Sequence, residues 1–424
     1  MKSKNTIVCF GPGPMFKGGI ANYNTSLAKA FDKLENTEVH IVSWTQQYPA
    51  IIPRDFIDKK SKVDQLEGTN IKVHYITNYN NPASWKATVR LIAGLKPSKV
   101  IFQWAIAIQG LPMGYIARRL KKLKEVEVLF DLHFVIQKEG SALDNKLTKV
   151  GIKNADSYIV HAFKTADELK EIFPDRQFEI IERGKEITGS GIKVLKLYHP
   201  VYDMFKPNPD FDIAKAKKEM GLKKYVFLYF GFIRKYKGLH NVIAAFANLA
   251  KQRDDVSLLI VGESFWNTLD SNKLSTRVKN ATFGVAKKIF LKNQDNEKDY
   301  NPLALIEKLN IKDLVYVYNE FVPNEEVPKY FQVSDNIMLF YLTATPSGVE
   351  SIGYNFNMPM LATNVGHFSE TVKEGFNGYL AQDRDIKSMI LAMNKAIEEP
   401  INRDNVAATS QDMSWDNYAA EIIR

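Results

Sequence analysis

A Pro-Ser-Gly turn at residues 346–348 precedes a short amphipathic run, and its residue types suit the binding of an anion. The start of a helix leaves backbone N–H groups unpaired and carries a partial positive charge. Ser347, Gly348 and Val349 would let a phosphate approach those N–H groups closely. The alternative is that Ser347 only caps a helix whose apolar residues face a core. The turn predicts either an anion site or an ordinary helix start.

Cations crowd a second turn, which follows the apolar run YVFLYF at residues 225–230. Arg234 and Lys237 stand at the entrance of a helical stretch, and Gly238 permits a close approach of a ligand. An arginine can bind two phosphate oxygens at once, so this turn is a candidate diphosphate site. A solvated cluster of charges is the alternative.

In the first half of the chain, a glycine-rich loop and a histidine each follow a strand-like run. The loop GPGPMFKGGI holds Gly18 and Gly19 before a helical stretch, where they would let the backbone reach a bulky ligand. The loop lacks the G-x-G-x-x-G pattern, so a nicotinamide cofactor is not expected. His133 follows VEVLFD and could move a proton or bond a sugar hydroxyl; an ordinary buried histidine is the alternative.

These turns need a scaffold, and the chain supplies short β-branched and aromatic runs that alternate with helical stretches. The predicted strands are TIVCF, EVHIVSW, IKVHYIT, KVIFQWA, VEVLFD, SYIVH and IKVLKL, and, after Pro200, YVFLYF, SLLIVG, DLVYVY, IMLFYL, PMLA and GYLA. Continuous apolar strands of this kind indicate parallel sheets covered on both faces. We therefore predict an α/β fold with two doubly wound domains, 1–200 and 201–412, and an insertion at 264–300. Ligands of such sheets bind beyond the carboxyl ends of the strands.

Composition places the chain among ordinary folded proteins. Its 424 residues are 45% hydrophobic and 25% charged, which argues against disorder. The single cysteine, Cys9, allows no intrachain disulfide, which fits a reducing cytoplasm. No run approaches the roughly 18 apolar residues of a membrane-spanning helix. No carboxylate cluster has the spacing of a metal site, so neither a metal nor a cofactor is expected.

The excess of positive charge lies in the first half. Residues 1–205 hold 30 Lys and Arg against 21 Asp and Glu, whereas residues 206–424 hold 27 against 27. Part of the excess falls within residues 116–124 and consists of Arg118, Arg119, Lys121, Lys122 and Lys124. Such a segment can hold a protein at an anionic membrane surface, or it can be a solvated helix face. Nucleic acid is not expected, because no basic motif is interleaved with aromatic residues.

Five further motifs, in their order and spacing, resemble family 4 of the retaining glycosyltransferases. They are GGIANY near the start, VGE at 261–263, FVPNEEVPKYF at 321–331, PMLATNVG at 359–366 and SWDNYAAEII at 414–423. GFIRKYKG, TATPSGV and YHPVYDMF are most similar to a bacterial subgroup that carries Ser-Gly-Val in the phosphate turn. The resemblance covers nearly the whole chain apart from the insertion.

This resemblance implies the GT-B fold, in which two Rossmann-like domains face each other across a cleft. The second domain would bind a nucleotide-sugar donor, with a UDP- or GDP-sugar expected, and the first would bind the acceptor. A C-terminal helix within 413–424 would cross back to the first domain. The implied catalytic residues are His133, Arg234 and Lys237, and the implied donor-binding residues are Gly18, Gly19, Glu263, Phe321, Val322, Ser347, Gly348, Val349 and Glu350.

The sequence departs from the family pattern at the donor site. The usual pair of glutamates would fall at Ala344 and Ile352, and neither is acidic. Glu350 lies nearby, where it could replace the ribose contact or point to solvent. Phe232 stands where many relatives have arginine, which leaves Arg234 to substitute for it.

The expected activity is metal-independent transfer of a hexosyl group to an acceptor hydroxyl with retained configuration. The acceptor would be a glycan or a lipid-linked molecule, in bacterial glycan or glycolipid synthesis, with the protein in the cytoplasm or peripheral at the inner membrane face. The missing glutamates leave a second hypothesis, a catalytically silent accessory protein that binds a sugar nucleotide or a glycan. A sugar-nucleotide epimerase is a third, for which no convincing acid and base pair is found besides His133 and Glu350.

Overall fold

The chain folds into two compact α/β units. The computed structural model describes residues 5–49, 56–59, 64–136, 142–186, 188–264, 300–344 and 346–424. Of these, the first unit comprises residues 5–198 and 415–424, and the second comprises residues 199–414. The predicted insertion at 264–300 lies outside the described residues except at its two ends. Among the described residues, every helix is too short or too polar to span a bilayer.

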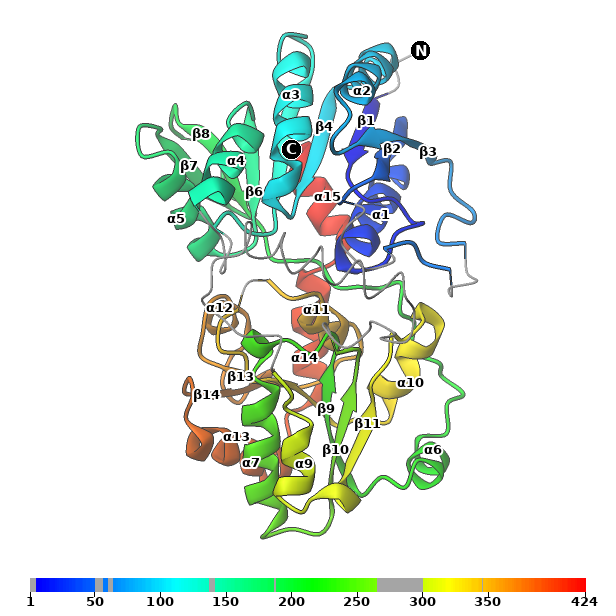
Figure 1. Cartoon of the computed structure of the whole chain (residues 1–424), viewed down its shortest axis with the longest axis vertical. Coiled ribbons are helices and arrows are strands. Elements are labelled where there is room, and N and C mark those ends of the chain that lie inside the picture. The colour runs from blue at the N-terminus through cyan, green and yellow to red at the C-terminus, as the bar shows by residue number, and fades with distance from the viewer. Residues whose placement is uncertain are drawn as a thin grey trace, which may run out of the picture. The chain divides into compact units, whose positions relative to one another are not determined.

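The first unit is built on an eight-stranded sheet in which all neighbouring strands run parallel (Figure 1). Its order is β3-β2-β1-β4-β5-β6-β8-β7. The strands are β1 (Asn5–Phe10), β2 (Thr37–Gln46), β3 (Lys72–Asn78), β4 (Lys99–Trp104), β5 (Glu127–Leu132), β6 (Ser157–Val160), β7 (Phe178–Glu182) and β8 (Ile192–Lys196). The prediction of a parallel sheet is confirmed, but β7 was not among the predicted strands.

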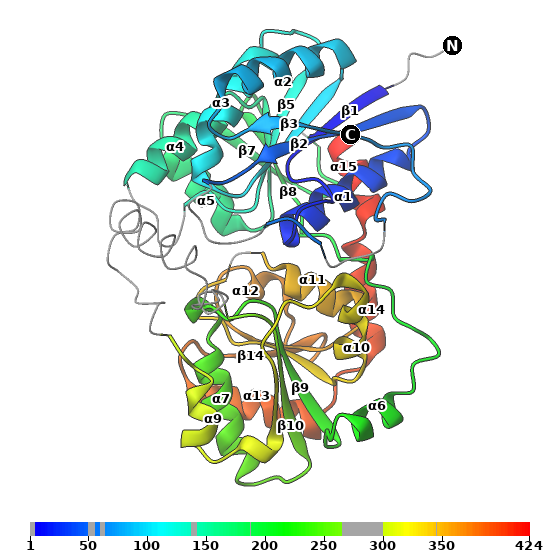
Figure 2. The same ribbon diagram turned by 45° about the vertical axis from the view of Figure 1, so that its right-hand side comes forward.

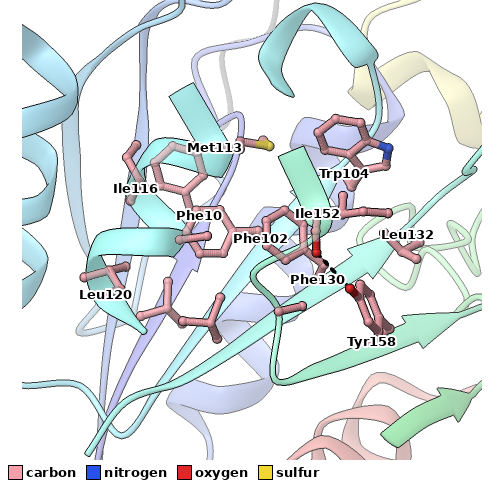
Figure 3. Packing of buried hydrophobic residues seen from close by; sticks show 14 of the residues in the cluster. Phe10, Phe102, Trp104, Met113, Ile116, Leu120, Phe130, Leu132, Ile152 and Tyr158 are labelled. Carbon is pink, nitrogen blue, oxygen red and sulfur yellow. Dashed lines mark hydrogen bonds between the residues drawn. The ribbon is translucent and has the colours of Figure 1, made fainter. Parts of the chain in front are cut away.

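Helices cover the first sheet and bury one face of it in an aromatic core. They are α1 (Gly19–Asp32), α2 (Pro82–Leu95), α3 (Gly110–Leu120), α4 (Ala142–Ile152) and α5 (Phe163–Ile172), with a 3-10 turn, η1 (Ala107–Gln109). Figure 3 shows part of the core, where the ring of Phe102 stacks on that of Phe130 at 4.8 Å and contacts that of Phe10 at 4.9 Å. Burial of each such side chain stabilises the fold by roughly 1.5–3 kcal/mol. This core fixes the carboxyl ends of β4 and β5.

The last helix, α15 (Trp415–Ile423), belongs to the first unit although it ends the chain. It packs beside α1 in both ribbon views (Figures 1 and 2). Trp415, Tyr418 and Ile422 are buried, and the ring of Trp415 meets that of Tyr23 on α1 at 5.0 Å. Apolar residues spaced three and four apart along α15 produce this buried stripe.

The second unit contains a six-stranded parallel sheet with the order β11-β10-β9-β12-β13-β14. Its strands are β9 (Tyr225–Phe230), β10 (Val256–Val261), β11 (Val315–Tyr318), β12 (Asn336–Leu339), β13 (Met360–Thr363) and β14 (Gly378–Ala381). All six correspond to predicted strands. The chain starts in the middle of the sheet, moves to one edge, and returns to the other side of β9, as in doubly wound folds.

Helices also surround the second sheet, and α7 packs beside α13 and α9 (Figure 2). The described helices are α6 (Ile213–Glu219), α7 (Leu239–Ala250), α9 (Ala304–Lys308), α10 (Val327–Gln332), α11 (Gly348–Asn355), α12 (Phe368–Thr371), α13 (Ile386–Glu398) and α14 (Arg403–Asp412), and the 3-10 turns are η2 (Lys235–Lys237), η4 (Lys312–Leu314) and η5 (Asn324–Glu326). The segment that enters this unit is tied to α11, because the Nδ1 atom of His199 lies 2.7 Å from the Ser351 hydroxyl.

Candidate functional site

Two glycines bring the ends of β9 and β10 together in the second unit. Gly231 and Gly262 follow these strands with φ values of +94° and +143°, which residues with side chains rarely adopt. A Cβ atom on Gly262 would overlap the carbonyl oxygen of Gly231, so only glycine fits this approach. The Gly231 N–H donates to the Val261 carbonyl at 2.8 Å, and the Ile233 N–H donates to the Glu263 carbonyl at 3.0 Å. These contacts hold the turns after β9 and β10 against each other.

The ammonium group of Lys237 lies beside Gly231, in the turn after β9. A Cβ atom built on Gly231 would be 2.9 Å from Lys237 Nζ and 3.3 Å from Val349 Cγ2, so the lysine tip and the first turn of α11 both reach Gly231. Gly238 has a φ of +66° and packs against the Phe340 carbonyl, which pins the cationic turn to the end of β12. From the sequence, the closeness of the cationic turn at 234–238 and the Pro-Ser-Gly turn at 346–348 was only a hypothesis. The structure brings these two turns together.

Lys237 is a buried cation without a bonded carboxylate. The residue is 7% exposed, and its ammonium group, 5.7 Å from the centre of the Tyr341 ring, makes no hydrogen bond or ion pair with any described residue. Burial, reinforced by the nearby charge of Arg234, lowers the pKa of Lys237 to about 7. A charge removed from water without a partner is costly to the fold, and an anionic ligand would relieve that cost.

The start of α11 is also unsatisfied. Ser347 occupies the N-cap position with extended φ and ψ angles, but its side chain makes no capping hydrogen bond. Ser347 therefore holds the N-cap position of a helix whose Ile352 and Phe356 are buried, as the alternative expected, but it does so without a side-chain bond. Within the described part of the chain, no acceptor is found for the N–H groups of Gly348, Val349 and Glu350. A Cβ atom on Gly348 would lie 2.9 Å from Tyr202 Cε2, which shows how tightly this turn is packed.

Glu350, in the first turn of α11, is a buried carboxylate. The residue is 3% exposed, so the alternative that it points to solvent is wrong. One carboxylate oxygen contacts His367 Nε2, and the other accepts the hydroxyl proton of Thr371. The physical reason is that the loop after β13 brings two donors to a carboxylate that would otherwise be buried alone. The predicted ribose contact stays a prediction.

The other residues predicted in the second unit lie on neighbouring turns. Arg234 directly precedes η2, and its guanidinium carbon lies 5.7 Å from the centre of the Tyr236 ring. Glu263 follows β10 and is partly buried. Phe321 and Val322 lie between β11 and η5 and are also partly buried.

The positions that departed from the family pattern have structural roles. Ala344 and Ile352 are 2% and 7% exposed, and both belong to the apolar interior. Gly366 approaches the Ala344 backbone so closely that a Cβ atom on Gly366 would overlap the Ala344 carbonyl oxygen. Phe232 is partly buried, and its carbonyl accepts the Tyr229 hydroxyl at 3.4 Å.

The first unit places the glycine loop and His133 at its own strand ends. Gly18 has a φ of +104°, and a Cβ atom there would meet open space. Gly19 starts α1 and is exposed. His133 follows β5, is 9% exposed, and has its Nε2 atom 2.8 Å from Gln103 Oε1. Burial lowers the pKa of His133 to about 4 against the opposing effect of Asp131, so the imidazole is neutral at pH 7.

A buried polar network next to His133 was missed by sequence reasoning. Asp131 accepts the Tyr23 hydroxyl at 2.9 Å and the Tyr418 hydroxyl at 3.2 Å, and His161 Nε2 lies 2.8 Å from its other oxygen. Burial alone would raise the pKa of Asp131, but His161 and these hydrogen bonds bring it below its usual range. The available signal was an aspartate that ends the otherwise apolar run of β5.

The donor set of the described residues contains no group of three or more His, Cys, Asp or Glu side chains that could hold a metal ion. In the second unit, the groups that could bind a ligand are cationic side chains and backbone N–H groups. The Lys237 ammonium group and the Val349 side chain at the start of α11 both lie beside Gly231, and ammonium groups and helix starts are both used to bind phosphate in proteins.

Comparisons with known proteins agree with this architecture. Residues 210–413 match the family model described as "Glycosyl transferases group 1". Spore coat protein SA of Bacillus subtilis (strain 168) is 21% identical over 232 residues, which are 54% of this chain and 54% of that protein. The alignment thus spans about half the length of this curated relative.

Solved structures extend the likeness to nearly the whole chain. HepE of Anabaena, crystallised with UDP and glucose, has a TM-score of 0.68 and 15% identity, with 99% of both chains covered. The apo lipopolysaccharide outer core galactosyltransferase WaaB has a TM-score of 0.61 and 16% identity, with 99% of both chains covered. Sucrose-phosphate synthase from Thermosynechococcus elongatus has a TM-score of 0.60 and 15% identity over 99% of this chain and 97% of that chain. The predicted GT-B fold is confirmed: the chain has this fold, and its residues 210–413 are similar to group 1 glycosyl transferases.

Proposed function

We propose that the protein transfers a hexosyl group from a nucleoside diphosphate sugar to an acceptor hydroxyl with retention of configuration, and that it belongs to family 4 of the retaining glycosyltransferases. The observation that carries this proposal is the buried ammonium group of Lys237, which meets the first turn of α11 at Gly231 and has no bonded carboxylate among the described residues. The match to group 1 glycosyl transferases and the UDP in the HepE crystals support a nucleotide-sugar ligand.

In the proposed reaction, the bond between the anomeric carbon and the β-phosphate oxygen breaks, and the nucleoside diphosphate leaves with the electron pair. The acceptor oxygen bonds to the same carbon, and its proton passes to the departing phosphate. Lys237, Arg234 and the N–H groups of Ser347, Gly348 and Val349 neutralise the charge that develops on the β-phosphate. These groups do so without a metal ion.

The remaining site residues are assigned by the same proposal. Glu263, Phe321 and Val322 hold the nucleoside of the donor, which is the uridine of a UDP-sugar or the guanosine of a GDP-sugar. Gly18 and Gly19 are assigned a role in donor binding, and the neutral imidazole of His133 a bond to a sugar hydroxyl. Closure around the donor would use the segment 200–209 as a hinge.

Isothermal titration calorimetry with UDP and GDP tests whether Lys237 binds the diphosphate of the donor. Lys237→Ala should weaken binding of the preferred nucleotide by about tenfold to a hundredfold, because charge-assisted phosphate contacts contribute about 1.5–3 kcal/mol each. The matched control is Lys251→Ala, which removes an exposed lysine after the other end of α7. Equal affinities in the wild type and Lys237→Ala would remove this lysine from the donor site.

A catalytically silent accessory protein is the second candidate, because apolar Ala344 and Ile352 stand where the usual glutamates are expected. Such a protein would bind a sugar nucleotide or a glycan without turning it over. Slow hydrolysis of UDP-glucose or GDP-mannose by the wild type, lost in Lys237→Ala, would support the enzyme. Tight binding with no hydrolysis and no transfer would support the accessory protein.

We further propose that the acceptor is a glycan or a lipid-linked molecule and that the protein acts in the cytoplasm at the inner membrane face, in bacterial glycan or glycolipid synthesis. At the end of α3, Arg118, Arg119, Lys122 and Lys124 are exposed around Leu123, which is itself 38% exposed. Basic groups beside an exposed apolar side chain suit an anionic lipid surface.

Sedimentation with vesicles tests the membrane proposal. Binding to phosphatidylglycerol vesicles should exceed binding to phosphatidylcholine vesicles and should fall severalfold in Lys122→Glu/Lys124→Glu, since each charge near the surface contributes about 1 kcal/mol. The control, Lys206→Glu/Lys308→Glu, makes the same change in net charge at exposed lysines of the second unit. An equal loss in both variants would contradict a specific surface on α3.

A further inference from the structure

The first turn of α11 carries a capping sequence that the fold does not use. Ser347 and Glu350 have the Ser-x-x-Glu spacing of a capping box, in which the glutamate reaches back to the N-cap N–H and the serine accepts a bond from the first turn. In the structure Ser347 makes no capping bond. The Glu350 carboxylate is bonded to His367 and Thr371, which come from another strand end.

The donors that hold Glu350 are themselves fixed in place. His367 immediately precedes α12, Thr371 is its last residue, and the two are 2% and 6% exposed. The Thr371 carbonyl accepts the Tyr354 hydroxyl at 3.0 Å and the Asn377 side-chain amide at 3.0 Å. Because Tyr354 lies one turn after Glu350 on α11, the helix and the loop after β13 are joined at two successive turns.

The position of this carboxylate decides what the start of α11 can bind. A glutamate that capped the helix would occupy the Ser347 N–H, one of the donors proposed for the diphosphate, and would place a negative charge beside any approaching phosphate. Paired with His367 and Thr371 instead, Glu350 does not take up the Ser347 N–H, for which no acceptor is found among the described residues.

We infer that His367 and Thr371 are positioning residues that hold Glu350 out of the capping box and so keep the start of α11 open to a diphosphate. The inference rests on the proposed function for the identity of the anion. It assigns Glu350 no direct contact with the ribose, and it gives the loop after β13 a part in donor affinity.

Calorimetric titration with UDP tests the inference in three variants. His367→Leu releases the carboxylate and should weaken UDP binding about tenfold, the size of a charge effect at a favourable helix start. His367→Leu/Glu350→Gln removes the released charge and should restore affinity to within about threefold of the wild type. His367→Gln, whose side-chain amide can donate at the place of Nε2, should retain wild-type affinity.

The pattern of these affinities separates this role from others. If Glu350 bound the ribose, Glu350→Gln would deepen the loss in His367→Leu, which would overturn the inference. Unchanged affinity in His367→Leu would overturn it as well. Loss of UDP binding in Lys237→Ala together with normal binding in His367→Leu would refute only this inference, whereas no effect of Lys237→Ala would refute the proposed phosphate site.

Folding is checked in the same samples by circular dichroism and thermal unfolding. Should His367→Leu not fold, Thr371→Val removes the other donor and should still weaken UDP binding about threefold, with reversal by Glu350→Gln. Wild-type affinity in a folded Thr371→Val protein would then overturn the inference.

Discussion

Tyr418 and Asp131 are 287 residues apart in the sequence, and the Tyr418 hydroxyl lies 3.2 Å from a carboxylate oxygen of Asp131. Tyr23 of α1 completes a triangle, 2.9 Å from the same oxygen and 2.7 Å from the Tyr418 hydroxyl. Two hydroxyl protons therefore serve one buried carboxylate oxygen. The last helix of the chain thus helps to keep a charged group stable at the strand end that carries His133.

Removing the Tyr418 hydroxyl should destabilise the first unit. We expect Tyr418→Phe to lower its free energy of unfolding by about 1–3 kcal/mol, because a buried hydrogen bond to a charged group is lost. Urea denaturation followed by tryptophan fluorescence measures this, since Trp44, Trp85, Trp104 and Trp415 all belong to the first unit.

A matched control joins the same two helices at the surface. Lys33, which directly follows α1, and Asp416 of α15 form an ion pair at 2.9 Å, with side chains 58% and 68% exposed. Lys33→Ala should cost at most about 1 kcal/mol, since exposed ion pairs contribute little. A larger effect of Lys33→Ala than of Tyr418→Phe would contradict the importance given to the buried network.

Donor binding should be linked to proton uptake at Lys237. The pKa of Lys237 is lowered to about 7 in the free protein, so at pH 8 most of its amine is neutral. A bound diphosphate favours the charged form and raises the pKa again. We expect UDP-glucose affinity to fall as the pH rises above 7, and the binding heat at pH 8 to depend on the ionisation enthalpy of the buffer.

The control for this linkage is Lys237→Arg, because a guanidinium group stays protonated over the whole range. Its UDP-glucose affinity, whatever its value at pH 7, should not fall between pH 7 and pH 9. Buffer-independent heats in the wild type would show that the lysine is already charged before binding.

The same lysine should make the unliganded protein less stable at neutral pH. Its folded pKa lies below the ordinary value of 10.5, so between about pH 7 and 10.5 the unfolded chain binds the proton and the folded chain does not. Stability therefore rises with pH across this window, and the cost is full below about pH 7. Lys237→Met should unfold at a higher temperature than the wild type at pH 6.5, and the gap should shrink towards pH 10. A gap that widens with pH would contradict the sign.

The strands of both sheets could be predicted because their apolar runs are continuous. Strand β7 was not predicted because Glu179 and Glu182 interrupt its apolar residues in FEIIE, and it lies at the edge of the sheet beside β8, where one side needs no partner. Only the resemblance predicted that the last helix packs on the first domain. The sequence of residues 413–424 does not indicate which helix it packs against.

The donor turns could be predicted from residue types because the carboxyl ends of parallel strands share one edge. That rule brings Lys237 and Ser347 to the same edge without any knowledge of contacts. The orientation of Glu350 could not be predicted in this way. Its partners His367 and Thr371 lie after β13, and the local Ser-x-x-Glu pattern favoured a capping box that tertiary contacts override.

Acid should weaken the first unit through His133. Burial lowers its pKa to about 4, below the ordinary value of 6.5, so the unfolded chain takes up the proton first as the pH falls. Stability contributed by the neutral imidazole is present above pH 6.5 and is lost progressively down to about pH 4, by about 3 kcal/mol in all. His133→Gln keeps a side chain that can bond Gln103 but has no group that titrates in this range. We expect urea denaturation to show a smaller loss between pH 7 and pH 4.5 in the variant than in the wild type, and parallel losses would assign the acid sensitivity to other groups.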